Sequence, residues 1–218
     1  MMMTSRPRLP LLPMLLAIAA VLAGVGGYAA WLAATAPPRF QGTVYEPAPA
    51  ADFRLIDEDG RPATLATYRG RPVLVFFGFT KCADYCPATL DRLARAVREL
   101  GDKAGGAQVL LVTVDPANDT PAALKQYLAR FGGRVSGLTG DTAALGAAWR
   151  SYSVYVAPSA SGHHGAAHHP ASAPAAPAQL NHSGVVYGID RNGDLRVVIT
   201  EGARLDAIRH DVRSLARL

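Results

Sequence analysis

The stretch PVLVFFGFTKCADYCP occupies residues 72–87 and predicts a strand, a loop and a helix in that order. Its first half, residues 72–79, is a short apolar run rich in β-branched and aromatic residues, which is typical of a buried central strand. Apolar residues recur at helical spacing after Cys86-Pro87 until Gly101, and proline is tolerated in the first turn of a helix. The two cysteines of the chain therefore lie at a strand-to-helix junction.

The same order of a strand followed by a helix recurs along the chain. Residues 108–115 (QVLLVTVD) predict a second buried strand, and Thr120-Pro121 begins a helix that ends before Gly132. Further strands are expected at 53–56, 135–138, near 152–156, at 184–190 and at 195–200, and further helices at 142–150 and about 203–216. Strands that alternate with helices imply an α/β fold whose sheet contains parallel pairs.

Two segments differ from this domain in composition. Residues 37–51 are rich in Pro and Ala and predict a semi-extended tether, so the domain proper is expected to span residues 52–218. Residues 158–179 are mostly Ala, Pro and Ser and include four histidines. Such a stretch cannot bury enough apolar surface to offset its ordering entropy, and we expect an exposed loop.

Residues 1–36 predict a membrane anchor. The run 11–36 is almost wholly apolar and exceeds the roughly 20 residues that cross a bilayer. Arg6 and Arg8 precede it, which predicts a cytoplasmic N-terminus and a domain on the periplasmic side of a bacterial-type inner membrane, held by a single span. A cleaved signal peptide stays open as the alternative, because Ala34-Thr35-Ala36 has the small-x-small form of a cleavage site.

The composition excludes several classes of protein. Hydrophobic residues make up 50% of the 218, which is too many for a disordered chain, and two cysteines cannot form a disulfide framework. The 22 basic and 17 acidic residues give a net charge of +5 without a Lys/Arg block. We therefore expect no nucleic-acid partner.

Cys82 and Cys86 are the first candidates for chemistry. Residues four apart on a helix share a face, with Cβ atoms about 5–6 Å apart, so two thiolates can reach one metal ion. A departure from regular helix at Cys82 would also allow a disulfide. The helix N-terminus and the neighbouring Lys81 favour thiolates. Metal binding and redox exchange both stay open, with a structural disulfide or inert core thiols as the other interpretations.

A histidine is the natural third ligand. His182 lies directly before the buried-looking run GVVYGID and is the best candidate, whereas His210 falls in the polar pattern of the last helix and is expected on the surface. Two thiolates with one imidazole favour copper over zinc. The remaining histidines offer either an auxiliary copper site or incidental linker residues: His163, His164, His168 and His169.

These residues resemble the Sco/SenC family, whose members are membrane-tethered, thioredoxin-like copper chaperones in cytochrome c oxidase assembly. The resemblance covers about residues 44–215. It rests on the strand VLVFFGFTKC, the Cys82-x-x-x-Cys86-Pro87 motif, the segment VDPANDTP at 114–121, and His182-Ser183 before VVYGID at 185–190. Asn118 stands where the family usually has a basic residue, and Ala83 replaces a common proline.

The resemblance implies a thioredoxin-like fold with a central mixed sheet flanked by helices. It implies that Cys82, Cys86 and His182 bind copper, as Cu(I) or Cu(II), and that the cysteines cycle between dithiol and disulfide. Asp115 would lie beside the site, where it either orients a ligand or caps the next segment. The implied partners are a copper-accepting cytochrome c oxidase subunit and a thioredoxin-like reductant or another copper carrier.

The main hypothesis is therefore a metallochaperone that delivers copper to the dinuclear copper centre of cytochrome c oxidase. A membrane-anchored thiol:disulfide oxidoreductase that reduces the oxidase subunit's cysteines is the alternative, and it leaves open whether the protein is an enzyme. Only tight copper binding requires His182, so this residue separates the two hypotheses. A peroxidase of the peroxiredoxin type would need an activating arginine, and Arg92, one turn past Cys86, is the nearest arginine and lies on the predicted helix.

Overall fold

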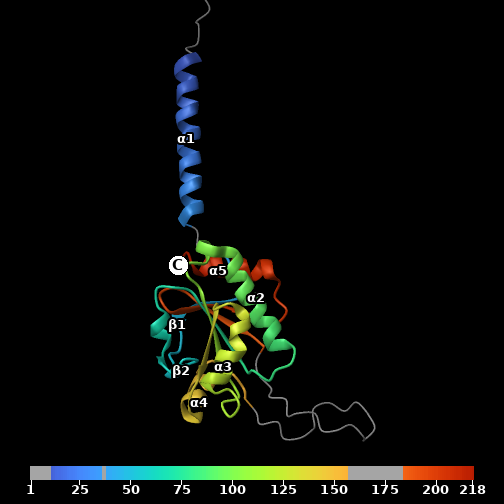
Figure 1. The fold of residues 1–218 in the computed structure, drawn as a ribbon. Helices are drawn as coiled ribbons and strands as arrows, with labels where there is room; N and C mark the ends of the chain where they lie inside the picture. Colours follow the sequence, from blue (N-terminus) through green and yellow to red (C-terminus); the bar gives the residue numbers. More distant parts are fainter. Residues whose placement is uncertain (1–10, 36–37, 157–183) are drawn as a thin grey trace, which may run out of the picture. The chain divides into compact units, whose positions relative to one another are not determined.

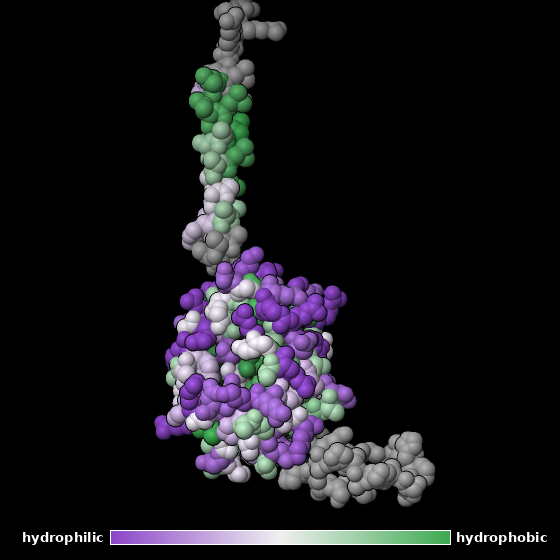
Figure 2. Space-filling view, in the orientation of Figure 1, coloured by the Kyte–Doolittle hydropathy of each residue, from purple (hydrophilic) through white to green (hydrophobic). Residues whose placement is uncertain are grey.

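The computed structural model describes residues 11–35, 38–156 and 184–218, which form two compact units, Met1–Pro38 and Arg39–Leu218. The first unit contains the helix α1 (Leu11–Thr35), drawn in blue in Figure 1. Its segment Leu12–Leu32 is 21 residues long with a mean hydropathy of 2.0, which is long and apolar enough to cross a membrane (Figure 2). The predicted N-terminal apolar helix is thus present, and it fits a membrane anchor.

The second unit is built on one eight-stranded sheet with the order β1-β8-β7-β4-β5-β6-β2-β3. Strands β4, β5 and β6 are parallel and the other pairs are antiparallel, so the sheet is mixed as expected. The strands are β1 (Thr43–Pro49), β2 (Leu55–Asp57), β3 (Pro62–Ala63), β4 (Val73–Gly78), β5 (Gln108–Thr113), β6 (Val135–Thr139), β7 (Val186–Ile189) and β8 (Asp194–Ile199).

Helices pack on both faces of this sheet. They are α2 (Tyr85–Leu100), α3 (Pro121–Leu128), α4 (Thr142–Ser151) and α5 (Leu205–Leu215), with single 3₁₀ turns η1 (Leu65–Tyr68), η2 (Gly101–Ala104) and η3 (Ala129–Phe131). The side chains of β4 alternate between the faces. Phe76 meets Tyr85 of α2 edge to face, whereas Phe77 packs against Tyr152, the residue after α4.

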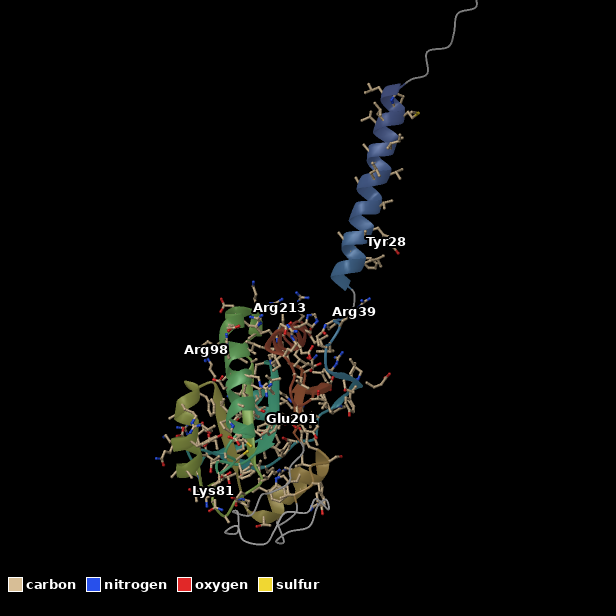
Figure 3. All side chains as sticks on the ribbon, turned by 90° about the vertical axis from the view of Figure 1, so that its right-hand side faces the viewer. Tyr28, Arg39, Lys81, Arg98, Glu201 and Arg213 are labelled. Atoms are coloured by element: carbon tan, nitrogen blue, oxygen red, sulfur yellow. The ribbon has the colours of Figure 1, made fainter. Side chains whose placement is uncertain are left out.

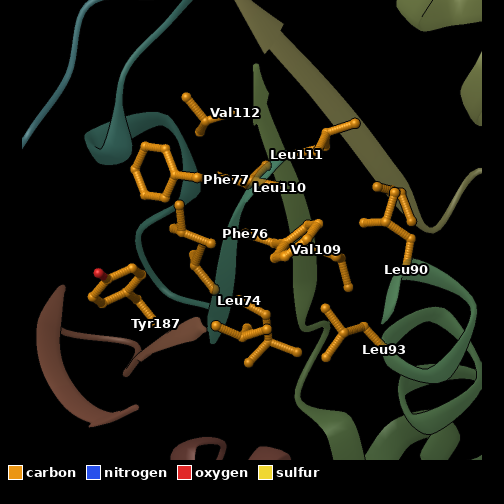
Figure 4. Close-up of a cluster of buried hydrophobic side chains, with 14 of the residues drawn as sticks. Leu74, Phe76, Phe77, Leu90, Leu93, Val109, Leu110, Leu111, Val112 and Tyr187 are labelled. Atoms are coloured by element: carbon orange, nitrogen blue, oxygen red, sulfur yellow. The ribbon is translucent and has the colours of Figure 1, made fainter. Parts of the chain in front are cut away.

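The core follows directly from the apolar run that predicts the central strand. All six residues of β4 are buried, and Phe76 and Phe77 are fully inaccessible. Figure 4 shows Leu90 and Leu93 of α2 beside β4 and β5, with Tyr187 of β7 on the other side of β4. The helix α2 buries the apolar stripe that its spacing predicts, and it ends at Leu100 before Gly101, which has a φ of 53°. This packing fixes the start of α2 at the carboxyl end of β4.

The predicted strand near 152–156 is wrong. Helix α4 runs to Ser151, and Ser153 then adopts a left-handed conformation with a φ of 54°. Tyr152 and Val154 are buried and Tyr155 is exposed, so the apolar alternation reflects packing rather than strand pairing. The hydroxyl of Tyr152 donates to the carbonyl of Ala51 at 2.8 Å.

The predicted tether 37–51 also differs from the structure. Residues 43–49 form the edge strand β1, which pairs antiparallel with β8 and contains an irregularity between Val44 and Ala48. Prolines 47 and 49 are compatible with an edge, where one side of the strand donates no ladder hydrogen bonds. The compact unit accordingly begins at Arg39 rather than at Asp52. The expected loop at 158–179 lies outside the described residues.

A buried carboxylate fastens the beginning of this unit to α5. Asp211 is 1% exposed and accepts hydrogen bonds from the backbone N–H groups of Gln41 at 2.6 Å and Gly42 at 3.0 Å. Burial raises the pKa of Asp211, while these two donors act in the opposite direction. His210 is exposed, as expected, and its Nε2 donates to the carbonyl of Arg39 at 2.6 Å. Residues 39–42 are therefore held on α5.

We expect Asp211→Asn to destabilise this attachment. The amide nitrogen of Asn would face a backbone N–H that now has an acceptor, and a buried donor without its acceptor costs about 1–3 kcal/mol. Denaturant unfolding should show this loss, and trypsin should cleave after Arg39 faster than in the wild type. Asp206→Asn, an exposed change on the same helix, is the control. Equal stability of the Asp211→Asn and Asp206→Asn variants would contradict the prediction.

Candidate metal centre

The cysteine loop connects the carboxyl end of β4 to the first turn of α2. Cys82 lies in this loop and is partly buried, and its N–H donates to the carbonyl of Phe79 at 3.4 Å. Cys86 is the second residue of α2 and is fully buried. Its N–H donates to Sγ of Cys82 at 3.3 Å, and the two residues are thiols rather than a disulfide. The predicted convergence of the two sulfurs at a helix N-terminus is present.

The two sulfurs differ in their surroundings. Burial, above all, raises the pKa of the Cys86 thiol, and the neighbouring Cys82 side chain acts in the same direction. The expectation that the helix N-terminus favours thiolates is therefore wrong for Cys86, because desolvation outweighs the favourable backbone contribution. A cation bound between the sulfurs would reverse this balance, since metal ligation deprotonates a coordinating thiol.

A glycine opposite Cys86 makes room for its sulfur. A Cβ added to Gly78, the last residue of β4, would lie 3.0 Å from Sγ of Cys86 and 2.8 Å from Cε1 of Phe76. Real Cβ atoms almost never approach other atoms so closely. The sulfur of Cys86 is thus packed directly against the backbone of the central strand.

Asp119 ties the cysteine loop to the end of β5. Its side chain is fully buried, and it accepts hydrogen bonds from Oγ1 of Thr113 at 2.6 Å, from Oγ1 of Thr80 at 2.5 Å and from the N–H of Thr80 at 3.2 Å. Burial raises its pKa and these donors lower it. Sequence reasoning did not single out Asp119. Its place in the matching segment 114–121 was the available signal.

Asp115 reaches the cysteine loop through a chain of polar contacts. Its carboxylate accepts two hydrogen bonds from Nδ2 of Asn118, at 3.0 and 2.8 Å, and Oδ1 of Asn118 accepts from the ammonium of Lys81. The backbone carbonyl of Asp115 also accepts from the N–H groups of Asn118 and Asp119. Asp115 therefore shapes the loop after β5. Asn118, which stands where the resemblance leads us to expect a basic residue, links the carboxylate of Asp115 to the ammonium of Lys81.

The chain re-enters the described structure at Gly184, in contact with Tyr85 of α2. The hydroxyl of Tyr85 donates to the carbonyl of Gly184 at 2.6 Å. A Cβ on Gly184 would lie 2.8 Å from this hydroxyl and 3.0 Å from Oε2 of Glu201, so a side chain at this position would have to displace one of these two groups. Among the described residues, no group of three or more His, Cys, Asp and Glu side chains could hold a metal ion. Five predicted ligands lie outside the described residues: His163, His164, His168, His169 and His182.

A second tyrosine, Tyr127 of α3, was not anticipated. Its hydroxyl is buried and has no hydrogen-bond partner within the described part of the chain. Burial, followed by the negative charge that Cys86 would carry, raises the pKa of Tyr127 to about 12. In the sequence, Tyr127 falls at helical spacing with other apolar residues, which indicates only a core position. The structure therefore brings a phenol into electrostatic range of the cysteine pair.

Comparison with known families matches residues 43–217 to SCO1/SenC. The chain belongs to this family. The bovine mitochondrial SCO2 homolog is 44% identical over 106 residues, which are 48% of this chain and 40% of that protein. The chain spans about half or less of the length of the first curated relatives it matches.

Solved structures of Sco proteins share the fold. The copper-bound ScoI of Arabidopsis thaliana has a TM-score of 0.66 and 26% identity, covering 78% of this chain and 99% of that one. The copper-bound ScoI of Bradyrhizobium japonicum has a TM-score of 0.61 and 28% identity, covering 76% and 98%. These matches confirm the family resemblance and the thioredoxin-like fold.

In this Sco-family chain the alkylating agent iodoacetamide should modify Cys82 well before Cys86. Cys86 is fully buried with a raised thiol pKa, and thiol reactivity follows access and thiolate fraction. Both cysteines fall in the tryptic peptide 82–92, so fragmentation mass spectrometry of that peptide can separate the two products at each time point. Unfolded protein, alkylated in denaturant, is the control and should show equal labelling. Prior labelling of Cys86 in the folded protein would contradict the structure.

Proposed function

We propose that this protein is a copper-binding metallochaperone that delivers copper to the dinuclear copper centre of cytochrome c oxidase. The observation that carries the proposal is the cysteine pair at the start of α2, together with the bond from Tyr85 to Gly184, two residues beyond His182. Two similar Sco structures were solved with copper bound, which supports copper as the cargo.

His182 completes the ligand set in this proposal. The carbonyl of Gly184 accepts a hydrogen bond from the hydroxyl of Tyr85, the first residue of α2 and the sequence neighbour of Cys86. His182 precedes Gly184 by two residues, and two residues of extended chain span at most about 7 Å. In this proposal its imidazole binds the same ion as the sulfurs of Cys82 and Cys86. Two thiolates and one imidazole suit a soft ion such as Cu(I).

The unequal burial of the two sulfurs sets the order in which they would release copper. Cys82 is the more accessible of the two, and Cys86 is enclosed by Gly78 and the core. An acceptor thiolate approaching from solvent therefore replaces Cys82 first, and copper leaves Cys86 last. Each thiol loses a proton when copper binds and regains one when copper departs, so copper loading is favoured by rising pH.

The anchor α1 places this exchange at a membrane. Arg6 and Arg8 before the apolar run support a single-pass protein of the bacterial inner membrane with its domain in the periplasm. The partner in this setting is the copper-accepting subunit of the oxidase. If Cys82 and Cys86 become oxidised to a disulfide, two electrons and two protons restore them. A thioredoxin-like reductant is the class of partner that supplies these, and another copper carrier would load the dithiol.

Anaerobic titration with Cu(I) tests the ligand set. We expect about one copper per chain in the wild type, and loss of tight binding in Cys82→Ser, Cys86→Ser and His182→Ala, because each variant lacks one of the three proposed ligands. His210→Ala, a histidine change on α5, is the control and should bind like the wild type. Undiminished affinity in His182→Ala would remove the third ligand and leave a thiol:disulfide oxidoreductase as the better interpretation.

Tyr85→Phe tests the contact that brings the two halves of the site together. Loss of one hydrogen bond to the carbonyl of Gly184 should weaken copper binding by about 3- to 10-fold, in line with a net value of about 0.5–1.5 kcal/mol. The measurement is competition for Cu(I) against a chelator of known affinity. Tyr68→Phe, in η1, is the matched control and should have no effect. Identical affinity of the Tyr85→Phe variant and the wild type would show that this bond does not position a copper ligand.

A further inference from the structure

Exposed cations gather at the end of the Arg39–Leu218 unit that lies opposite the cysteine loop. Figure 3 shows Arg39, Arg98 and Arg213 at this end and Lys81, of the cysteine loop, at the other. We call this surface the basic end, and its eight side chains are all exposed: Arg39, Arg69, Arg71, Arg98, Lys103, Arg191, Arg213 and Arg217.

Hydrogen bonds and close packing join these segments into one surface. The guanidinium of Arg69 donates to the carbonyl of Asn192 at 3.0 Å, and that of Arg191 donates to the carbonyl of Gly70 at 3.1 Å. Asn192 in turn donates from Nδ2 to the carbonyl of Leu218 at 3.3 Å. A Cβ on Gly105, just after η2, would lie 2.9 Å from the Cβ of Ala216. The hairpin between β7 and β8, the entry to β4, η2 and the end of α5 thus share this end.

The charge of the basic end is largely unopposed. None of its eight cations forms an ion pair within the described part of the chain. The carboxylate of Glu99 nearby is already bound by Arg95 and Arg209. From Arg39 onward the chain has 20 Lys and Arg against 17 Asp and Glu, a net charge of only +3, so the eight cations concentrate the positive charge of the unit at one end.

Chain length limits how far the first residue of this surface can lie from the end of α1. Arg39 follows Thr35, the last residue of α1, by four residues, and four extended residues span at most about 14 Å. The backbone from Arg39 to Gly42 is held on α5 by Asp211, His210 and Ser214. The first residue of the unit therefore cannot move away from the α5 surface that carries Arg213 and Arg217.

We propose that the basic end docks on anionic phospholipid headgroups beside the anchor. The inference rests on the membrane-anchored part of the proposed function, with α1 in the bilayer. Clustered Lys and Arg side chains near a membrane surface are attracted to anionic lipid, and the attraction falls off within a Debye length of about 8 Å. The chain tether keeps the cations within reach of that field.

Docking would set the height and direction of the cysteine loop. Helix α2 runs from the loop to the basic end, and its 16 residues span about 24 Å. With the basic end on the headgroups, Cys82 faces away from the bilayer and toward a partner that extends above it. A domain that merely hangs from its anchor would present the site in all directions.

The test uses energy transfer in the full-length chain, reconstituted in lipid nanodiscs. One reporter cysteine, Asn192→Cys at the basic end or Ala117→Cys near the cysteine loop, carries a donor dye in a background with Cys82→Ser and Cys86→Ala. A trace of headgroup-labelled lipid is the acceptor. In discs containing phosphatidylglycerol, transfer from position 192 should exceed transfer from position 117 at least about twofold, given their separation along α2. In phosphatidylcholine discs the two should converge.

Two charge variants make the test specific. Changing Arg98, Lys103, Arg213 and Arg217 to Gln should abolish the difference between the reporters, as should about 1 M salt, where the Debye length is about 3 Å. The matched control removes the same charge elsewhere by changing Arg54, Arg61, Arg150 and Arg204 to Gln, and it should keep the difference. Equal transfer from both reporters in anionic discs, or equal loss in both charge variants, would overturn the proposal.

Independent measurements separate this result from the proposed function. Size-exclusion chromatography first shows whether the chain enters the discs, which tests the anchor itself. Copper binding plays no part, because the reporters lack both cysteines. If the buried Cys86→Ala change impairs folding, amide hydrogen exchange of the unaltered chain replaces the dyes, and residues 205–215 should exchange more slowly in anionic than in zwitterionic discs. Equal exchange in both would also overturn the proposal.

Discussion

The buried carboxylate of Asp119 is the constraint on which the cysteine loop depends. It accepts hydrogen bonds from Thr113 at the end of β5 and from Thr80 just before the cysteines, so the loop takes its shape from the sheet. Such a carboxylate is costly to bury unless its donors remain in place. The loop is consequently held by the sheet, while Cys82 within it is only partly buried.

The central strand and the first helix could be predicted because each carries a strong local signal. Residues 72–79 are continuously apolar, and α2 has a helical stripe bounded by Pro87 and Gly101. The edge strand β1 was missed because its seven side chains are all exposed, so no alternation of buried and exposed residues marks it, and two prolines follow the β-prone residues Thr43, Val44 and Tyr45. Its pairing with β8, almost 150 residues away, is a tertiary fact that local sequence does not encode.

The candidate site likewise has features that the sequence predicts and features that only the folded structure shows. The cysteine motif identified its two sulfurs, but the sequence could not show that burial would raise the pKa of Cys86, since burial depends on Gly78 and Phe76 in a strand that the loop folds back on. Asp119, Tyr85 and Tyr127 were likewise beyond sequence reasoning, because their roles arise from contacts between separate elements. His182, the ligand inferred from sequence, lies outside the described residues.

The edge strand β1 affects whether two copies of the protein can pair through the edges of their sheets. Proline lacks an N–H, so positions 47 and 49 cannot donate to an added strand, and the irregularity after Val44 interrupts the row of backbone groups further. At the opposite edge, β3 is only two residues long and begins with Pro62. Both borders of the sheet thus discourage sheet-to-sheet aggregation. In the membrane-anchored protein proposed above, neighbouring copies share one surface, and edges of this kind keep their sheets from pairing.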